Sequence, residues 1–203
     1  YTAGSTTLSA LAKGGSLALV SPADVLIAST PTKHEYEGKT LEELCRLTGK
    51  TLNETVEQIL VEEGEGVVAV IFGMEEADVR RVLAHPTTMI GSDGIPSVDG
   101  KPHPRLYGTF ARVLGFYTRD EHLLSLEDAI YRMSGFPAQK FRLPNRGVIR
   151  LGAFADLVVF DAQTIAEAGT YQEPRQYPPG IDYVIVNGVI TVDRGRHTGE
   201  RSG

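Results

Sequence analysis

The sequence predicts an α/β fold, with strands and helices of a β/α barrel first and a set of short strands after them. Residues 67–72 form an apolar run typical of a buried strand, and residues 75–85 form an amphipathic helix pattern that stops before a proline. A second apolar run, at 87–91, leads directly to Asp93. This order of strand, helix and strand is what the end of a barrel requires. From Arg146 onward, short strand patterns replace the helix period.

Two short helices are predicted before the strand at 67–72. Thr40 followed by Glu43, and Thr51 followed by Glu54, are capping boxes that open a helix each. Leucines at every third position of 41–47 supply the apolar stripe of the first helix. The sequence therefore predicts a small helical insertion before the last barrel strand.

The second half of the chain combines a long loop, one helix and short strands. We expect a loop at 94–115, a helix from 125 to about 135, and strands at 148–150, 156–160, 183–186 and 189–192. Asn187-Gly188 is a strong hairpin signal, because a type I′ turn needs positive φ at both central positions. The segment 170–180, rich in proline and tyrosine, is expected to be a surface loop.

Composition excludes some classes of function. Among 203 residues, 20 Lys and Arg against 26 Asp and Glu give a net charge of −6, and the basic residues form no stripe, so nucleic-acid binding is not expected. No apolar stretch approaches the roughly 18 residues of a membrane span. A single cysteine, Cys45, cannot form an internal disulfide, which agrees with a cytoplasmic location. The chain starts at Tyr1 rather than Met and shows no visible signal-peptide pattern, and we expect it to be the C-terminal part of a longer protein.

Asp93 and Arg105 are the candidate site residues on chemical grounds. Catalytic groups of a β/α barrel lie where strands end, so Asp93 is placed as a general base would be. The alternative is that segment 92–94 is only a turn, since Ser, Asp and Gly all favour turns. Arg105 carries a planar fork of donors that suits a carboxylate, and the alternative for it is an ion pair with Asp99.

Five segments point further, to one family. They are Tyr-Thr-Ala-Gly-Ser-Thr at 1–6, Gly-Ser-Asp-Gly at 91–94, His-Pro-Arg-Leu-Tyr-Gly-Thr-Phe at 103–110, Arg-Gly-Val-Ile at 146–149, and Ala-Asp-Leu-Val-Val-Phe-Asp at 155–161. In this order they resemble the N-acyl-D-amino-acid deacylases (D-aminoacylases) of the amidohydrolase superfamily. The least similar part lies between about Lys13 and Glu65.

The resemblance implies a fold and a division of the chain. Residues 1–141 would be the last strands and helices of a TIM-like (β/α)8 metal-dependent hydrolase barrel, with a helical lid inserted at about 14–65. Residues 142–203 would be strands of a small C-terminal β-sandwich. The acyl-group preference cannot be transferred, because the family's sequence is hardest to follow in the lid.

The resemblance also implies an activity. A metal-activated water would cleave the amide bond of a small-molecule N-acyl-D-amino acid, releasing a carboxylate and a free D-amino acid, with Asp93 as general base and acid. Arg105 would bind the substrate α-carboxylate, and Ser5 would donate a hydroxyl in the pocket. His103 would touch the substrate or orient the loop, and Tyr1 would form pocket wall.

Zinc is the implied cofactor. The family's zinc ligands, a cysteine and histidines, belong to sequence that precedes Tyr1, and Asp93 would be at most a weak ligand. The missing N-terminal part of the same protein is thus the expected partner, and the isolated chain is expected to be inactive. Discrimination among neutral, D-glutamate and D-aspartate substrates would need an additional cation, for which Lys33 and Arg112 are candidates.

Two alternatives remain open. A hydantoinase-like or dihydropyrimidinase-like amidohydrolase acting on cyclic amides would share Asp93, the metal and the sandwich, but would not need Arg105 for an α-carboxylate. The other alternative is a non-catalytic truncated domain that serves only in packing or assembly.

Overall fold

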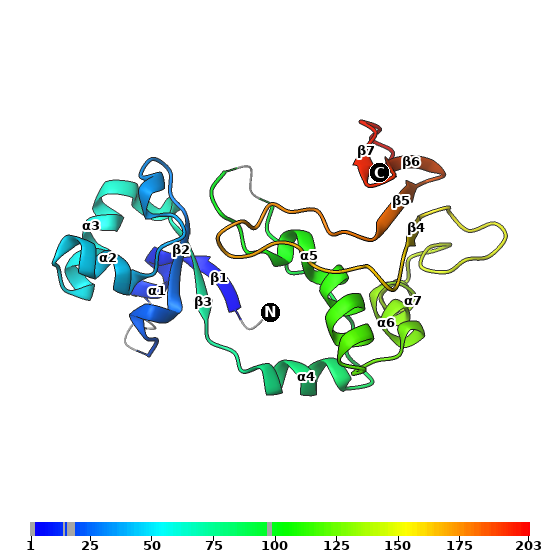
Figure 1. Ribbon diagram of the computed structural model, residues 1–203, viewed down its shortest axis with the longest axis horizontal. Coiled ribbons are helices and arrows are strands. Elements are labelled where there is room, and N and C mark those ends of the chain that lie inside the picture. Colours follow the sequence, from blue (N-terminus) through cyan, green and yellow to red (C-terminus); the bar gives the residue numbers. More distant parts are fainter. Residues whose placement is uncertain (1–2, 14, 16–18, 97–98) are drawn as a thin grey trace. The chain divides into compact units, whose positions relative to one another are not determined.

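A computed structural model describes residues 3–13, 15, 19–96 and 99–203, with the backbone alone for residues 3–5. The chain forms two compact units (Figure 1). Unit 1 comprises residues 1–79, 94–106 and 170–175, and unit 2 comprises residues 80–93, 107–169 and 176–203.

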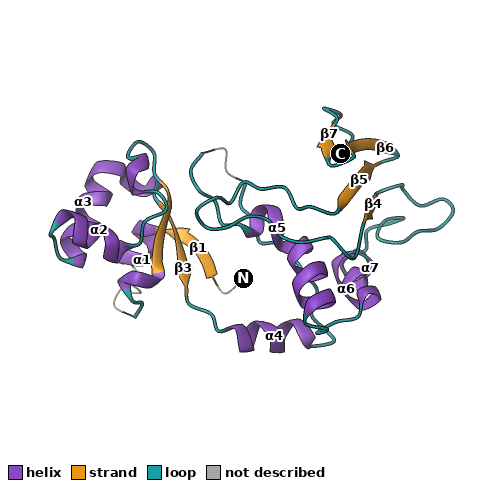
Figure 2. Ribbon diagram, in the orientation of Figure 1, coloured by secondary structure: helices purple, strands orange, loops and turns teal. Residues whose placement is uncertain are grey.

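Unit 1 contains an antiparallel sheet in the order β1-β3-β2, with helices on one face (Figure 2). Its elements are β1 (Ala3–Thr7), α1 (Leu8–Lys13), η2 (Pro22–Asp24), β2 (Val25–Ser29), η3 (His34–Tyr36), α2 (Leu41–Thr48), α3 (Leu52–Glu63), η4 (Gly64–Gly66) and β3 (Val68–Phe72). The helix α4 (Glu76–Ala84) follows and continues into unit 2. The segment predicted to be a helical insertion therefore also contributes a strand, β2.

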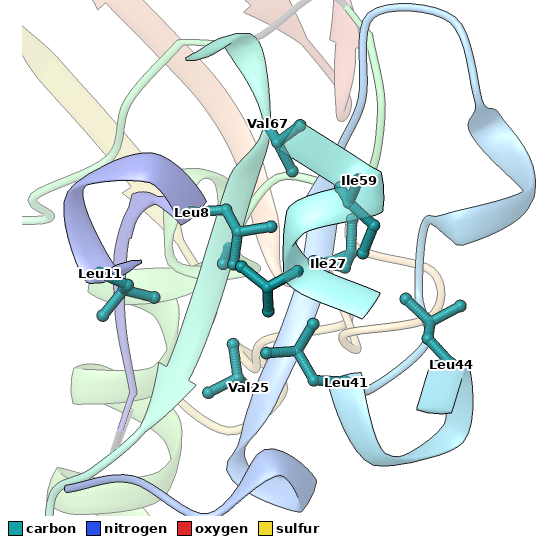
Figure 3. Packing of buried hydrophobic residues seen from close by; sticks show 10 residues of the cluster. Leu8, Leu11, Val25, Ile27, Leu41, Leu44, Ile59 and Val67 are labelled. Carbon is teal, nitrogen blue, oxygen red and sulfur yellow. The ribbon is translucent and has the colours of Figure 1, made fainter. Parts of the chain in front are cut away.

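The core of unit 1 lies between the sheet and its helices. Side chains alternate along β2, so that Val25 and Ile27 face the helices and Leu26 faces the other side. Figure 3 shows how the side chains on the helix side converge. The members of this cluster are Leu8, Leu11, Val25, Ile27, Leu41, Leu44, Val56, Ile59, Val67 and Ala69. Burying one such large side chain contributes about 1.5–3 kcal/mol, so the cluster joins the sheet and helices into one core.

Both predicted capping boxes are confirmed. Thr40 and Glu43 open α2, and Thr51 and Glu54 open α3, with both reciprocal hydrogen bonds in each box. The predicted apolar stripe of α2 is wrong at its third member, because Leu47 is 64% exposed. A step of three residues falls about 60° short of a full turn, so the third leucine has rotated off the buried face.

Unit 2 combines helices with an antiparallel sheet in the order β4-β5-β6-β7. Its elements are α5 (Arg105–Arg112, whose first two residues belong to unit 1), a π-helix η5 (Val113–Asp120), α6 (Leu126–Met133), α7 (Gly135–Lys140), β4 (Leu157–Phe160), β5 (Ile181–Val186), β6 (Val189–Asp193) and β7 (Arg196–His197). The predicted hairpin turn is confirmed, since Asn187 and Gly188 have φ of 49° and 84°.

Three predictions for these regions are wrong. Residues 87–91 and 148–150 form no strand, and the expected loop at 94–115 contains α5. A strand needs a partner for its backbone groups, and at Ile90 the N–H instead donates to the Arg132 carbonyl, 3.0 Å away. Every strand pair among the described residues is antiparallel, so these residues contain no closed parallel barrel. None of the described helices is long and apolar enough to span a membrane.

Candidate functional site

Asp93 ends the segment of unit 2 that follows α4. Its side chain is exposed, and its φ of 48° places the backbone in the left-handed region. Aspartate tolerates this conformation better than most residues, and such backbone positions concentrate at functional sites. Three residues earlier, Ile90 is only 8% exposed, so the segment is anchored just before Asp93.

Arg132 of α6 holds this segment from both sides. Its guanidinium donates to the carbonyl oxygens of Leu83 and His85, at 2.8 and 2.6 Å, where α4 ends. Its own carbonyl accepts the N–H of Ile90 at 3.0 Å, and its Nε donates to Asp128 at 2.8 Å. A charged side chain that is 6% exposed must be paired, and this pairing fixes the turn that leads to Asp93.

The His-Pro-Arg motif lies in unit 1 and opens α5. The Nδ1 atom of His103 accepts the backbone N–H of Arg105 at 3.0 Å. The neutral imidazole must then carry its proton on Nε2, because a ring nitrogen that accepts cannot also donate. His103 and Arg105 are 5% and 9% exposed, and Pro104 between them is fully buried. The motif is therefore a packed turn with a defined histidine tautomer.

The predicted site residues are divided between the two units. Ser5, His103 and Arg105 belong to unit 1, whereas Asp93 belongs to unit 2. The backbone of Ser5 pairs with Val70 in the β1–β3 ladder. Tyr1 lies outside the described residues, as does the side chain of Ser5. Within unit 1 the structure brings His103 and Arg105 together through the hydrogen bond at Nδ1.

The two candidate cations for an acidic substrate side chain both have intramolecular partners. Arg112 forms an ion pair with Glu167 and lies over the Phe116 ring, 4.5 Å from its centroid. Lys33 lies 4.0 Å from a carboxylate oxygen of Glu35. Either cation would have to exchange a partner within the chain for a substrate carboxylate.

Sequence reasoning missed three residues that hold the site segments. Arg132 lies between Tyr131 and Met133 on α6, where the sequence does not show that its side chain is buried, and Tyr171 and Arg175 lie in what the composition marked as a surface loop. Tyr171 contacts His103, and Arg175 donates to backbone carbonyls of the loop before His103. These contacts join residues far apart in the chain, so no local pattern could reveal them.

The described residues do not by themselves form a zinc site. A zinc ion normally needs at least three protein ligands. In the part of the chain that the structure describes, no group of three or more His, Cys, Asp or Glu side chains could hold a metal ion. That Asp93 is a weak metal ligand stays a prediction.

Comparison with known proteins decides the family. Residues 27–192 match the sequence profile of the amidohydrolase family. The chain belongs to this family. It is 43% identical to the D-aminoacylase of Alcaligenes xylosoxydans xylosoxydans over 169 residues, which cover 83% of the chain and 34% of that protein. It is 48% identical to the N-acyl-D-glutamate deacylase of the same organism over 120 residues, 59% of the chain and 24% of that protein.

A solved amidohydrolase structure agrees with this assignment. The chain matches an N-acyl-D-glutamate deacylase from Bordetella bronchiseptica, solved with zinc and a phosphonate inhibitor, with a TM-score of 0.83 and 36% identity. The match covers 97% of the chain and 40% of that structure. The resemblance to the deacylases is thus confirmed, and with it an α/β fold from a barrel-containing family. The chain spans 34% of the D-aminoacylase that it matches.

Proposed function

We propose that this amidohydrolase chain is the C-terminal part of a zinc-dependent N-acyl-D-amino-acid deacylase. The observation that carries the proposal is the 43% identity to a D-aminoacylase over 83% of the chain. That relative and the other matches are much longer than this chain, so the active unit would include further sequence of the same protein.

The division of the chain follows from the same proposal. Residues 1–141 would contribute the last elements of the barrel, with the lid at about 14–65, and residues 142–203 the sandwich strands. The four-stranded antiparallel sheet β4–β7 at 157–197 supports the second assignment, because sandwich sheets are antiparallel.

Asp93 would act as general base and then as general acid. Its carboxylate would take a proton from the attacking water and deliver it to the departing nitrogen, so one group serves both halves of the reaction. The exposed side chain and the anchored backbone before it suit a base that must be reached by substrate yet stay in place. Zinc, held mainly by residues of the same protein that precede this chain, would supply Lewis-acid polarisation.

Arg105 would bind the α-carboxylate of the substrate. A guanidinium pairs with a carboxylate through two parallel hydrogen bonds, which fixes orientation as well as affinity. At 9% exposure Arg105 lies in a low-dielectric environment, where such a pair is stronger than in water. Ser5 and Tyr1 would line the same pocket, and His103 would hold the loop.

The proposal is tested with the protein produced from its complete reading frame and loaded with zinc. We expect hydrolysis of N-acetyl-D-methionine, little hydrolysis of the L isomer, and none of a hydantoin. Asp93→Asn should lower kcat by about 10³-fold or more while substrate still binds. Preferred hydrolysis of the hydantoin would instead support a cyclic amidohydrolase, and absence of all turnover would support a non-catalytic domain.

A further inference from the structure

Residues 170–175, named the strap here, cover the face of the unit 1 sheet opposite its helices. Three side chains are buried on that face: Leu26, Ala28 and Val70. Tyr171 of the strap packs against them beside Phe72. The rings of Tyr171 and Phe72 meet edge to face, with 4.7 Å between their centroids. The strap is therefore part of the packing of unit 1, although the chain reaches it long after β3.

Tyr171 also contacts the histidine that holds Arg105. Its ring meets the His103 ring edge to face at 5.2 Å, and its hydroxyl lies 3.5 Å from Nε2. Since Nδ1 of His103 accepts the Arg105 N–H, Nε2 carries the proton and faces the tyrosine oxygen. Tyr171 thereby restricts both the position of the imidazole and the tautomer that Arg105 needs.

Arg175 fixes the other end of the same loop. Its Nη2 donates to the carbonyl oxygens of Asp99 and Gly100, at 2.8 and 3.2 Å, and its Nε donates to Gly100 at 3.3 Å. Gly100 lies so close to β2 that a Cβ there would be 2.6 Å from the Cβ of Ser29. Lys101 donates its N–H to a carbonyl oxygen of β2 at 2.6 Å. The loop that ends in Arg105 is thus held against the sheet.

We propose that the strap is a positioning element for substrate-carboxylate binding, with Tyr171 and Arg175 placing Arg105 through His103 and the 99–101 backbone. The inference rests on the proposed function, because it assumes that Arg105 binds the carboxylate. A guanidinium pairs bidentately only within a narrow range of positions, so a small displacement of the loop weakens substrate binding. The strap thereby acts on KM and leaves proton transfer by Asp93 unchanged.

The test uses the complete active enzyme and a pair of substrates. N-acetyl-D-methionine has the α-carboxylate, and N-acetyl-D-methioninamide replaces it with a neutral amide. For Tyr171→Leu and Arg175→Gln we expect KM for the acid to rise about tenfold, with kcat changed less than about twofold. KM for the amide should stay at the wild-type value, because that substrate makes no ion pair with Arg105. Tyr171→Phe keeps the ring and should raise KM about twofold, since 3.5 Å is a long hydrogen bond.

Matched controls separate positioning from general stability. Tyr183→Leu removes a tyrosine from β5 of unit 2, far along the chain from any proposed site residue, and should leave both KM values unchanged. A second readout uses calorimetry with Asp93→Asn as background, where the acid binds without being hydrolysed. Adding Arg175→Gln should weaken binding of the acid about tenfold and leave binding of the amide unaltered.

The possible outcomes distinguish the positioning role of the strap from the proposed function of the protein. If Arg105→Lys raises KM for the acid while the strap variants match the wild type, the strap has no positioning role and the proposed function stands. Equal KM increases for acid and amide would also overturn the positioning role. If the wild-type enzyme hydrolyses neither substrate, the proposed function fails, and the inference fails with it. Should Tyr171→Leu not fold, Tyr171→Phe and Arg175→Gln give the same comparison.

Discussion

The sheets of the two units are built from similar residues but are covered very differently. In β2 of unit 1, Val25, Leu26 and Ile27 are at most 4% exposed, because the helices cover one face and the strap the other. In β4 of unit 2, Val158 and Val159 are 54% and 47% exposed. A run of β-branched residues therefore predicts a strand, but how deeply that strand is buried depends on which distant segments cover it.

Polar contacts hold the start of β4 to the turn between β5 and β6 in the second sheet. Asp156, just before β4, accepts the backbone N–H of Asn187 at 2.8 Å and forms an ion pair with Arg146. The Arg146 guanidinium also donates to the Asn187 side chain at 2.8 Å and lies over the Phe154 ring, 4.2 Å from its centroid. Two of the five sequence segments that identified the family, 146–149 and 155–161, therefore meet in one structural cluster.

The largest expected effect comes from truncating the same residue type in the two sheets. Ile27→Ala in β2 should lower the free energy of unfolding of unit 1 by about 2–5 kcal/mol, because a fully buried side chain leaves a cavity. Ile190→Ala in β6, where Ile190 is 44% exposed, should cost less than about 1 kcal/mol. Urea unfolding followed by hydrogen exchange in each unit measures both. Equal costs would show that the second sheet is covered in solution.

A somewhat smaller effect is expected at Arg132, the buried cation of unit 2. Arg132→Met removes the donors to Leu83 and His85, and should lower the free energy of unfolding by about 1–3 kcal/mol because two partly buried carbonyl oxygens lose their donor. The amide of Ile90 should also exchange faster with solvent. Arg150→Met, which removes an exposed arginine, is the control. Unchanged exchange at Ile90 in Arg132→Met would mean that Arg132 does not hold the segment before Asp93.

The polar cluster of the second sheet should respond to pH. The Asn187 N–H, and then Arg146, hold the pKa of Asp156 below its ordinary value. A carboxyl whose pKa is lower in the folded state stabilises the fold above its unfolded pKa of about 3.9, and this contribution is lost as pH falls through the folded value. Amide exchange at the 187–188 turn, corrected for its intrinsic rate, should therefore accelerate below about pH 4. Asp156→Asn should remove this pH dependence.

The smallest effect is expected on the exposed face of β4. Val158→Thr keeps the β-branched shape and should change the unfolding free energy by no more than about 0.5 kcal/mol. A thermal denaturation curve measures it. A loss of several degrees in Tm would show that Val158 is packed against something in solution, and would weaken the contrast between the sheets.

Features with local signals were the ones that could be predicted from sequence. The capping boxes at Thr40 and Thr51 and the turn at Asn187-Gly188 depend on residues within a few positions of each other, and all three were confirmed. The strands predicted at 87–91 and 148–150 were wrong, because a strand forms only where a distant segment supplies hydrogen-bond partners. An apolar run does not carry that information.

In the candidate site, too, only the residues with a local sequence signal could be predicted. Chemistry and order along the chain were enough to single out Asp93, His103 and Arg105, and their catalytic and binding roles stay predictions. The residues that hold them, Arg132 and Tyr171, act through contacts with segments far away in the sequence. Their polar or aromatic character did not indicate these contacts, because only the folded chain shows which loop each residue contacts.

The assembly of unit 1 from three separated stretches sets an order of events during synthesis. Residues 1–79 leave the ribosome before the rest of this chain, but the last piece of the same unit, 170–175, emerges only after most of unit 2. Until then one face of the sheet, with Leu26 and Val70, has no strap over it. A nascent chain therefore exposes this apolar face until residues 170–175 are made, and we expect a product that terminates before them to aggregate more readily than the full chain.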